Sequence, residues 1–142
     1  MLSAWKDRNK QGKFFTIFPW VWLVAGYCIT MLVLCLYGRA YIDSDIAGDV
    51  MLADLLNREG GLLNAGWWYS SELRVVYLQL FYRLALLVFP NDWYAAQMLG
   101  QALWMLLLIA SYLYAAHGLK LKNCGVWGAA ALACPFGTWY LW

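Results

Sequence analysis

The sequence predicts an all-α membrane protein, a polytopic helix bundle, and three observations lead to this prediction. Hydrophobic residues make up 64% of the 142-residue chain and charged residues 13%, whereas soluble domains average about 45–50% apolar and about 25% charged residues. Residues 18–37 contain no charge, and about 20 apolar residues can cross the hydrocarbon layer as a helix. Ten Trp and ten Tyr suit the aromatic belts of a membrane protein.

Residues 1–17 are predicted to form a cytoplasmic N-terminus, and residues 18–37 the first transmembrane span. The positive-inside rule places basic residues on the cytoplasmic side, and four of them precede the span: Lys6, Arg8, Lys10 and Lys13. A cleaved signal peptide is the alternative. The retained span is favoured because the apolar run exceeds the usual length of about 7–15 residues and no A-x-A site follows it. We expect the protein in the plasma (inner) membrane.

Residues 38–74 are predicted to form an external loop that holds six of the eight acidic residues. Within this loop, residues 45–57 are predicted to be an amphipathic helix that lies along the membrane surface. Asp43 or Ser44 can cap its start, and Gly60-Gly61 can end it. Apolar residues recur there at helical spacing: Ile46, Val50 and Ala53.

Three further spans are predicted, which gives about four in this chain. They cover residues 75–89, which include Arg83, then residues 93–116 and residues 124–142. Proline ends a helix and an aspartate can cap the next one. The sequence Pro90-Asn91-Asp92 therefore predicts a turn between the second and third spans.

Simple alternation of these spans places Lys120 and Lys122 on the external side, against the positive-inside rule. Either the N-terminal basic residues override the rule, or residues 75–89 do not cross fully; we favour the first interpretation. Residues 137–142 close the sequence without a polar flank. This ending indicates the N-terminal part of a longer polytopic protein, with the fourth span truncated.

The candidate site residues are acidic, with one arginine. Asp45 and Asp49 are four residues apart and share one face of a helix, and Asp43 lies just before the helix. The positive end of the helix dipole stabilises a carboxylate in the first turn, so Asp45 is expected to stay ionised, as a general base requires. Glu72 and Arg74 mark the return to the bilayer, where a guanidinium can bind a lipid phosphate through two hydrogen bonds.

No metal site and no cofactor are predicted. The lone histidine, His117, has no second His or Cys beside it and is interpreted as an interfacial or helix-end residue. A divalent cation stays open as an alternative, because carboxylate-only sites suit Mg²⁺ or Mn²⁺ and Asp43, Asp45 and Asp49 are close in sequence. The net charge of +2 is not gathered into a basic surface, so no nucleic-acid partner is predicted.

Structural interpretations of the same residues are equally open. Asp43 can simply cap the helix, Asp49 can simply face water, and Asp54 with Arg58 can form a surface ion pair of a few tenths of a kcal/mol. Arg83 lies inside a predicted span, where ionisable groups are usually functional. Alternatively, its long side chain extends toward the cytoplasmic interface.

Two segments carry a resemblance to a known family. Tyr41-Ile42-Asp43-Ser44-Asp45-Ile46-Ala47 and Trp68-Tyr69-Ser70-Ser71-Glu72-Leu73-Arg74-Val75 resemble a group of uncharacterised bacterial polytopic proteins in the GT-C superfamily of membrane glycosyltransferases. Similarity to protein O-mannosyltransferases and aminoarabinose transferases is looser. In that superfamily an aspartate just after the first span is the catalytic base. The resemblance implies this role for Asp45, although Ile46 stands where the family commonly has a glutamate.

The resemblance also implies a reaction. The donor would be a sugar linked to polyprenyl phosphate, and the base would deprotonate an acceptor hydroxyl that attacks the anomeric carbon with inversion. Arg74 would hold the leaving phosphate, and Glu72 would orient donor or acceptor. The remaining spans of a longer chain would complete the site, so the isolated chain is expected to be inactive.

The competing class is a non-enzymatic small membrane protein, a transport or assembly subunit. In that case Arg83 and the acidic loop would serve helix pairing rather than catalysis. An ion pathway is a weaker alternative, because the acidic residues lie outside the predicted spans.

Overall fold

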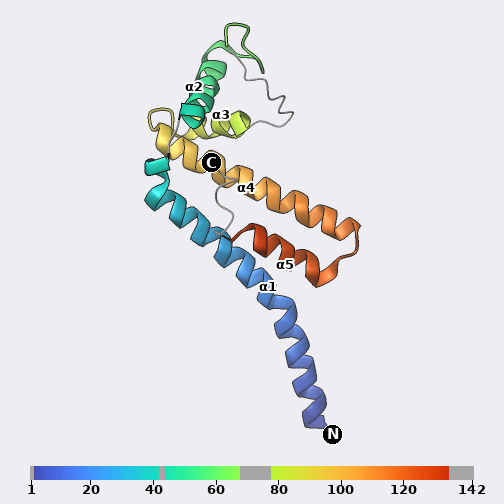
Figure 1. Ribbon diagram of the computed structural model, residues 1–142. Helices are drawn as coiled ribbons and strands as arrows, with labels where there is room; N and C mark the ends of the chain where they lie inside the picture. Colours follow the sequence, from blue (N-terminus) through green and yellow to red (C-terminus); the bar gives the residue numbers. More distant parts are fainter. Residues whose placement is uncertain (1, 42–43, 68–77, 135–142) are drawn as a thin grey trace. The chain divides into compact units, whose positions relative to one another are not determined.

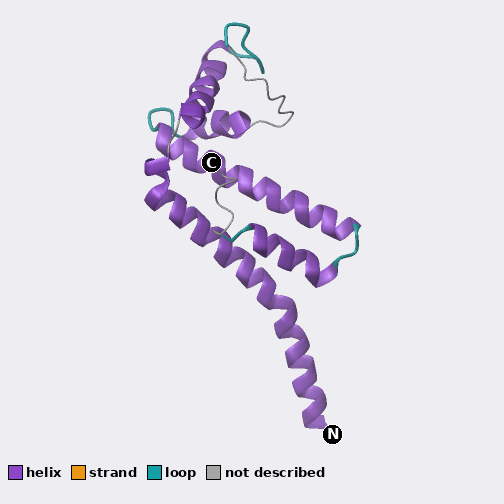
Figure 2. Cartoon of the chain, in the orientation of Figure 1, coloured by secondary structure: helices purple, strands orange, loops and turns teal. Residues whose placement is uncertain are grey.

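The computed structural model describes residues 2–41, 44–67 and 78–134, and in these ranges it contains helices and no strand (Figures 1 and 2). The all-helical prediction is therefore confirmed for this part of the chain. The elements in order are α1 (Leu2–Tyr37), the 3-10 helix η1 (Gly38–Tyr41), α2 (Ser44–Glu59), α3 (Leu78–Val88), α4 (Trp93–Gly118) and α5 (Lys122–Leu132).

Two of the described helical segments are long and apolar enough to cross a membrane. They are Thr16–Ala40, with a mean hydropathy of 2.0, and Trp93–Gly118, with 1.6. Only 28% and 22% of their apolar windows are buried inside the protein, whereas the core helix of a soluble protein would be mostly covered. The two helices indicate a membrane protein.

Helix α3 is apolar but has only 11 residues. At a rise of 1.5 Å per residue it is about 17 Å long, roughly half of the 30 Å hydrocarbon layer. Two of the four predicted spans thus coincide with helices of spanning length. The fourth is described only as far as residue 134, where α5 covers Lys122–Leu132, and residues 135–142 lie outside the described part.

The chain divides into two compact units. The first unit contains Met1–Val33 and Leu107–Tyr140; the second contains Leu34–Leu106 and the last two residues. In the first unit, the hydroxyl of Thr30 donates a hydrogen bond of 2.8 Å to the carbonyl of Ala133. A Cβ on Gly26 would lie 3.3 Å from the same carbonyl oxygen. Small residues thus bring α1 close to the C-terminal end of α5, as in many membrane helix pairs.

A tight turn joins α4 to α5 in the same unit. Lys120 has a φ of 57°, a conformation common at helix C-termini but rare for residues other than glycine. The amide of Leu121 donates to the carbonyl of Ala116 at 2.9 Å. A Cβ on Gly125 would lie 2.7 Å from the Cβ of Ala116, so glycine allows the two helices to meet directly after the turn.

In the second unit, α2 packs on α3 and on the first turns of α4. The core consists of six buried residues: Val50, Ala53, Tyr82, Ala85, Leu86 and Ala96. Tyr82 is fully buried, and its ring lies against the backbone of Gly100. Beside it, Phe81 and Trp104 pack edge to face with their ring centroids 5.5 Å apart. This core fixes the orientation of α2, which carries the predicted catalytic carboxylates.

The helix ends follow the signals in the sequence. Helix α2 ends before Gly60 and Gly61, whose φ angles are 77° and 91°, and the amide of Gly60 bonds the carbonyl of Leu56 at 3.1 Å. Asp92 caps α4 through its carboxylate, which accepts the amide of Ala95 at 3.0 Å. Both of these predicted helix ends are confirmed.

The first turn of α4 is tied to the last turn of α1 within the second unit. The Tyr94 hydroxyl lies 3.1 Å from the carbonyl oxygen of Leu34 and 3.0 Å from that of Cys35. The guanidinium of Arg39 lies over the Tyr94 ring, 4.7 Å from its centroid, which adds a cation–π contact. The beginning of α4 is thereby held beside the end of α1.

Candidate functional site

Two of the five predicted site residues lie in the described part of the chain. Asp45 and Asp49 are on α2, whereas Asp43, Glu72 and Arg74 lie outside the described residues. The site can therefore be built from α2 and its neighbours.

Asp45 is exposed in the first turn of α2. It follows the first candidate span, Thr16–Ala40, by five positions. The unbonded amides of a first helical turn favour a negative charge, typically by about 0.3–1 kcal/mol at an exposed position. Asp45 is thus a carboxylate that solvent and substrate can reach, which makes it a candidate general base.

Asp49 has a different environment. It is half-buried, and its carboxylate accepts a hydrogen bond of 3.0 Å from the side-chain amide of Gln79 on α3. Gln79 is itself buried, with 7% of its surface exposed. The interpretation that Asp49 only faces water is wrong, because its position on α2 falls within the arc of the helix that packs on α3.

Arg83 binds the C-terminal end of α2. Its Nε donates to Oδ1 of Asn57 at 3.0 Å, and Nδ2 of Asn57 donates back to the Arg83 carbonyl at 3.1 Å. The guanidinium also donates to the carbonyls of Gly61, at 2.7 Å, and Leu56, at 3.4 Å. The Leu56 carbonyl also accepts the amide of Gly60, and Gly61 lies just beyond the last residue of α2. Arg83 thus pairs α3 with α2, as the non-enzymatic class predicts, and its extension toward the cytoplasmic interface stays a prediction.

We expect Arg83→Lys to lower the free energy of unfolding by about 1–2 kcal/mol, because lysine cannot reproduce the planar set of donors that reaches Asn57 and two carbonyls. The free energy of unfolding of each variant is measured by chemical denaturation in detergent, monitored by circular dichroism. Arg58→Lys is the matched control: the exposed Arg58 forms one ion pair with Asp54, so its replacement should cost about 0.5 kcal/mol or less. Equal losses would contradict the assigned role of Arg83.

A small cavity lies on a different face of α2. Its volume is about 180 Å³, and it is lined by Met51, Asp54, Leu55, Arg58, Trp67 and Trp93. Asp54 and Arg58 form the predicted ion pair, with 2.7 Å between nitrogen and oxygen. Nine residues separate Asp45 from Asp54, or about two and a half turns, so the cavity lies on the side of α2 opposite Asp45. It is separate from the candidate base.

The sequence analysis missed the meeting of Trp67 and Trp93 at this cavity. Met51 and Leu55 line this cavity as well. The available signal was their position on α2, about half a turn away from Ile46 and Val50.

The described part of the chain does not decide whether the predicted carboxylates bind a metal ion. They contain no group of three His, Cys, Asp or Glu side chains able to hold an ion. Asp43, one of the three carboxylates of that alternative, lies outside them. The divalent cation stays a prediction.

Comparison with known proteins finds no relative. No protein-family model matches the chain, and neither curated proteins nor solved structures show significant similarity to it. Any function must therefore be argued from the chain's own residues.

Proposed function

We propose that this chain belongs to a membrane glycosyltransferase of the GT-C type, which transfers a sugar from a polyprenyl-phosphate donor to an acceptor hydroxyl at the external membrane face. The observation that carries the proposal is Asp45, an exposed carboxylate in the first turn of a helix that closely follows an apolar span. The lipid tail of such a donor stays in the bilayer, and its sugar phosphate reaches the surface where α2 begins.

In the proposed reaction Asp45 accepts the proton of the acceptor hydroxyl. The hydroxyl oxygen forms a bond to the anomeric carbon as the bond between that carbon and the phosphate oxygen breaks. The electron pair leaves with polyprenyl phosphate. Arg74 is proposed to bind this phosphate and Glu72 to orient donor or acceptor. Asp49 is proposed to position α2 through Gln79 rather than to exchange protons.

The proposal includes a membrane topology in which α1 and α4 cross the bilayer and α2 and α3 stay on the external side. Two contacts support it. The first turn of α4 lies against the end of α1, where Tyr94 meets the Leu34 carbonyl. The last turn of α4 shares a cavity with Trp20, near the beginning of the first span. In the proposed topology α4 runs back toward the side where α1 starts.

This topology removes the conflict over the basic residues. It places Lys120 and Lys122 on the cytoplasmic side together with the N-terminal lysines, as the positive-inside rule requires. We therefore prefer the interpretation that residues 75–89 do not cross the membrane fully. The described helix in this segment, α3, has about half the length needed to cross.

Labelling of single cysteines in intact cells distinguishes the two topologies. With the native cysteines replaced, Asn91→Cys should react with an impermeant maleimide from outside, and Leu119→Cys only after permeabilisation. Both positions are exposed in the structure. Four alternating spans give the opposite result at both positions. Leu62→Cys, in the external loop under either topology, is the positive control.

The test of the function is transfer of labelled sugar from polyprenyl-phosphate donors in membranes that hold the protein encoded by the full reading frame around this sequence. Transfer that depends on Asp45 supports the proposal. The absence of transfer from every donor tried, with the protein correctly inserted, would reject it.

A second candidate, the non-enzymatic transport or assembly subunit, is favoured by one observation. The polar side chains between α2 and α3 are used in holding these helices together: Arg83 with Asn57, and Gln79 with Asp49. This candidate predicts unchanged function when Asp45 is replaced, and loss of function when Arg83 is replaced.

A further inference from the structure

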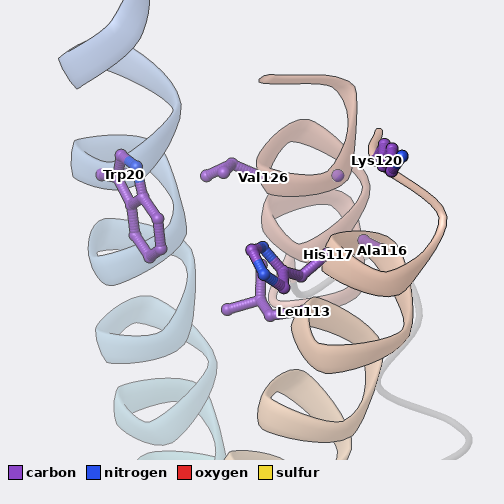
Figure 3. A pocket seen from close by; sticks show the side chains of 7 residues that line it. Trp20, Leu113, Ala116, His117, Lys120 and Val126 are labelled. Atoms are coloured by element: carbon purple, nitrogen blue, oxygen red, sulfur yellow. The ribbon is translucent and has the colours of Figure 1, made fainter. Parts of the chain in front are cut away.

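A cavity of about 480 Å³ lies wholly within the first unit, away from the candidate site. Its lining comes from α1, the last turns of α4, the turn and the start of α5: Trp20, Leu113, Ala116, His117, Lys120, Gly125 and Val126. Its volume falls in the range of about 300–1,000 Å³ that is typical of small-molecule sites. Figure 3 shows the His117 imidazole and the Trp20 indole turned toward the same space, with Lys120 at the turn.

The walls of this cavity are apolar, and its polar groups are basic. Trp20, Leu113 and Val126 supply the apolar surface. His117 and Lys120 are both exposed and supply nitrogen donors. No acidic side chain is among the lining residues in the part of the chain that the structure describes. The combination suits a ligand with an anionic head and an apolar body.

The backbone fixes the two basic residues relative to each other. Lys120 takes its left-handed conformation, with φ at 57°, while its amide bonds the carbonyl of His117 at 3.0 Å. The next amide, that of Leu121, bonds the carbonyl of Ala116. The turn that carries both side chains is thus closed by its own backbone hydrogen bonds, so that binding requires less ordering of the backbone.

We propose that this cavity binds the phosphate-bearing headgroup of an anionic membrane phospholipid. The cavity lies at the end of the spanning helix α4 and beside a tryptophan near the start of the first span, which is the level where headgroups lie. In the proposed topology this is the cytoplasmic face, whose leaflet is rich in anionic lipid and attracts basic residues. The lipid phosphate takes hydrogen bonds from Lys120 and His117, and the glycerol and first methylenes cover Trp20 and Val126. This inference does not depend on sugar transfer.

Native mass spectrometry of the whole protein tests the proposal. The protein is released from nanodiscs that contain equal amounts of phosphatidylglycerol and phosphatidylcholine, and the retained lipid is identified. The wild-type chain should retain phosphatidylglycerol preferentially. His117→Gln combined with Lys120→Asn should lower that retention about fivefold or more, since the variant removes both basic side chains that are proposed to bind the phosphate in the cavity. Asparagine tolerates the positive φ at position 120, so the turn should be kept.

Two further variants separate the cavity from general attraction to basic residues. Val126→Phe fills the apolar part and keeps every charge, so it should also lower retention. Lys122→Asn removes one charge from the same link and should leave retention within twofold of wild type. If Lys122→Asn and the double variant lose retention equally while Val126→Phe loses none, the proposal is overturned.

The source of the phosphate is tested separately. Millimolar glycerol phosphate, added after extraction, should leave the retained phospholipid in place, because the soluble headgroup lacks the methylenes that cover Trp20. Displacement of the lipid by glycerol phosphate would show a site for soluble phosphate and would overturn the assignment to a lipid.

Discussion

Asp45→Asn is expected to lower sugar transfer by about 10²–10⁴-fold, the usual contribution of a general base. Asparagine has the size of aspartate but cannot accept the proton of the acceptor hydroxyl. The protein should still fold, since the exposed carboxylate contributes only about 0.3–1 kcal/mol through the helix dipole. Initial rates in membranes measure the effect, with expression and melting temperature measured on the same samples.

Asp49→Asn is the matched control for this experiment. Oδ1 of asparagine can still accept the hydrogen bond from Gln79, which the structure places at 3.0 Å from the Asp49 carboxylate, so the contact between α2 and α3 is kept. Transfer should then fall less than about tenfold. The reverse pattern, with Asp49→Asn inactive and Asp45→Asn active, would move the base one turn along α2 and contradict the assignment of Asp45.

Local features of the fold were predictable from the sequence. The helix predicted over residues 45–57 lies within α2, Ser44–Glu59, and the run over residues 93–116 lies within α4, Trp93–Gly118. Periodicity, capping residues and glycines act within a few residues of each other, so a single sequence contains these signals. The ion pair between Asp54 and Arg58 is local in the same sense, because its members are four residues apart on one helix.

The partners of the polar residues were not predictable in this way. Arg83 meets Asn57 across 26 positions, and Gln79 meets Asp49 across 30. Neither pair follows from spacing, because each depends on how α3 packs on α2. The direction of α4 likewise depends on the contact of Tyr94 with the end of α1, about 60 positions away. Counting apolar runs predicts four alternating spans, whereas two of the described helical segments have spanning length, Thr16–Ala40 and Trp93–Gly118.

Gly100→Ala is expected to lower the free energy of unfolding by about 2–3 kcal/mol. This lies in the upper part of the range of about 1–3 kcal/mol that overpacking a core usually costs. A Cβ at this position would overlap the ring of Tyr82, lying 2.7 Å from Cε1, and would also lie 3.3 Å from the Tyr82 backbone nitrogen. The ring cannot move aside cheaply, because Tyr82 is fully buried among Val50, Ala53 and Ala96. Relief would require α3 to move away from α4, which opens the core that orients α2.

Gly118→Ala supplies the matched control on the same helix. A Cβ there meets no atom within 4 Å, and alanine is a better helix former than glycine by up to about 1 kcal/mol. Thermal unfolding in detergent should therefore shift in opposite directions for the two variants, downward for Gly100→Ala and slightly upward or not at all for Gly118→Ala. A Gly100→Ala variant as stable as the wild type would mean that α3 does not pack on α4 as described. In that case the orientation of α2, and with it the exposure of Asp45, would lose its structural basis.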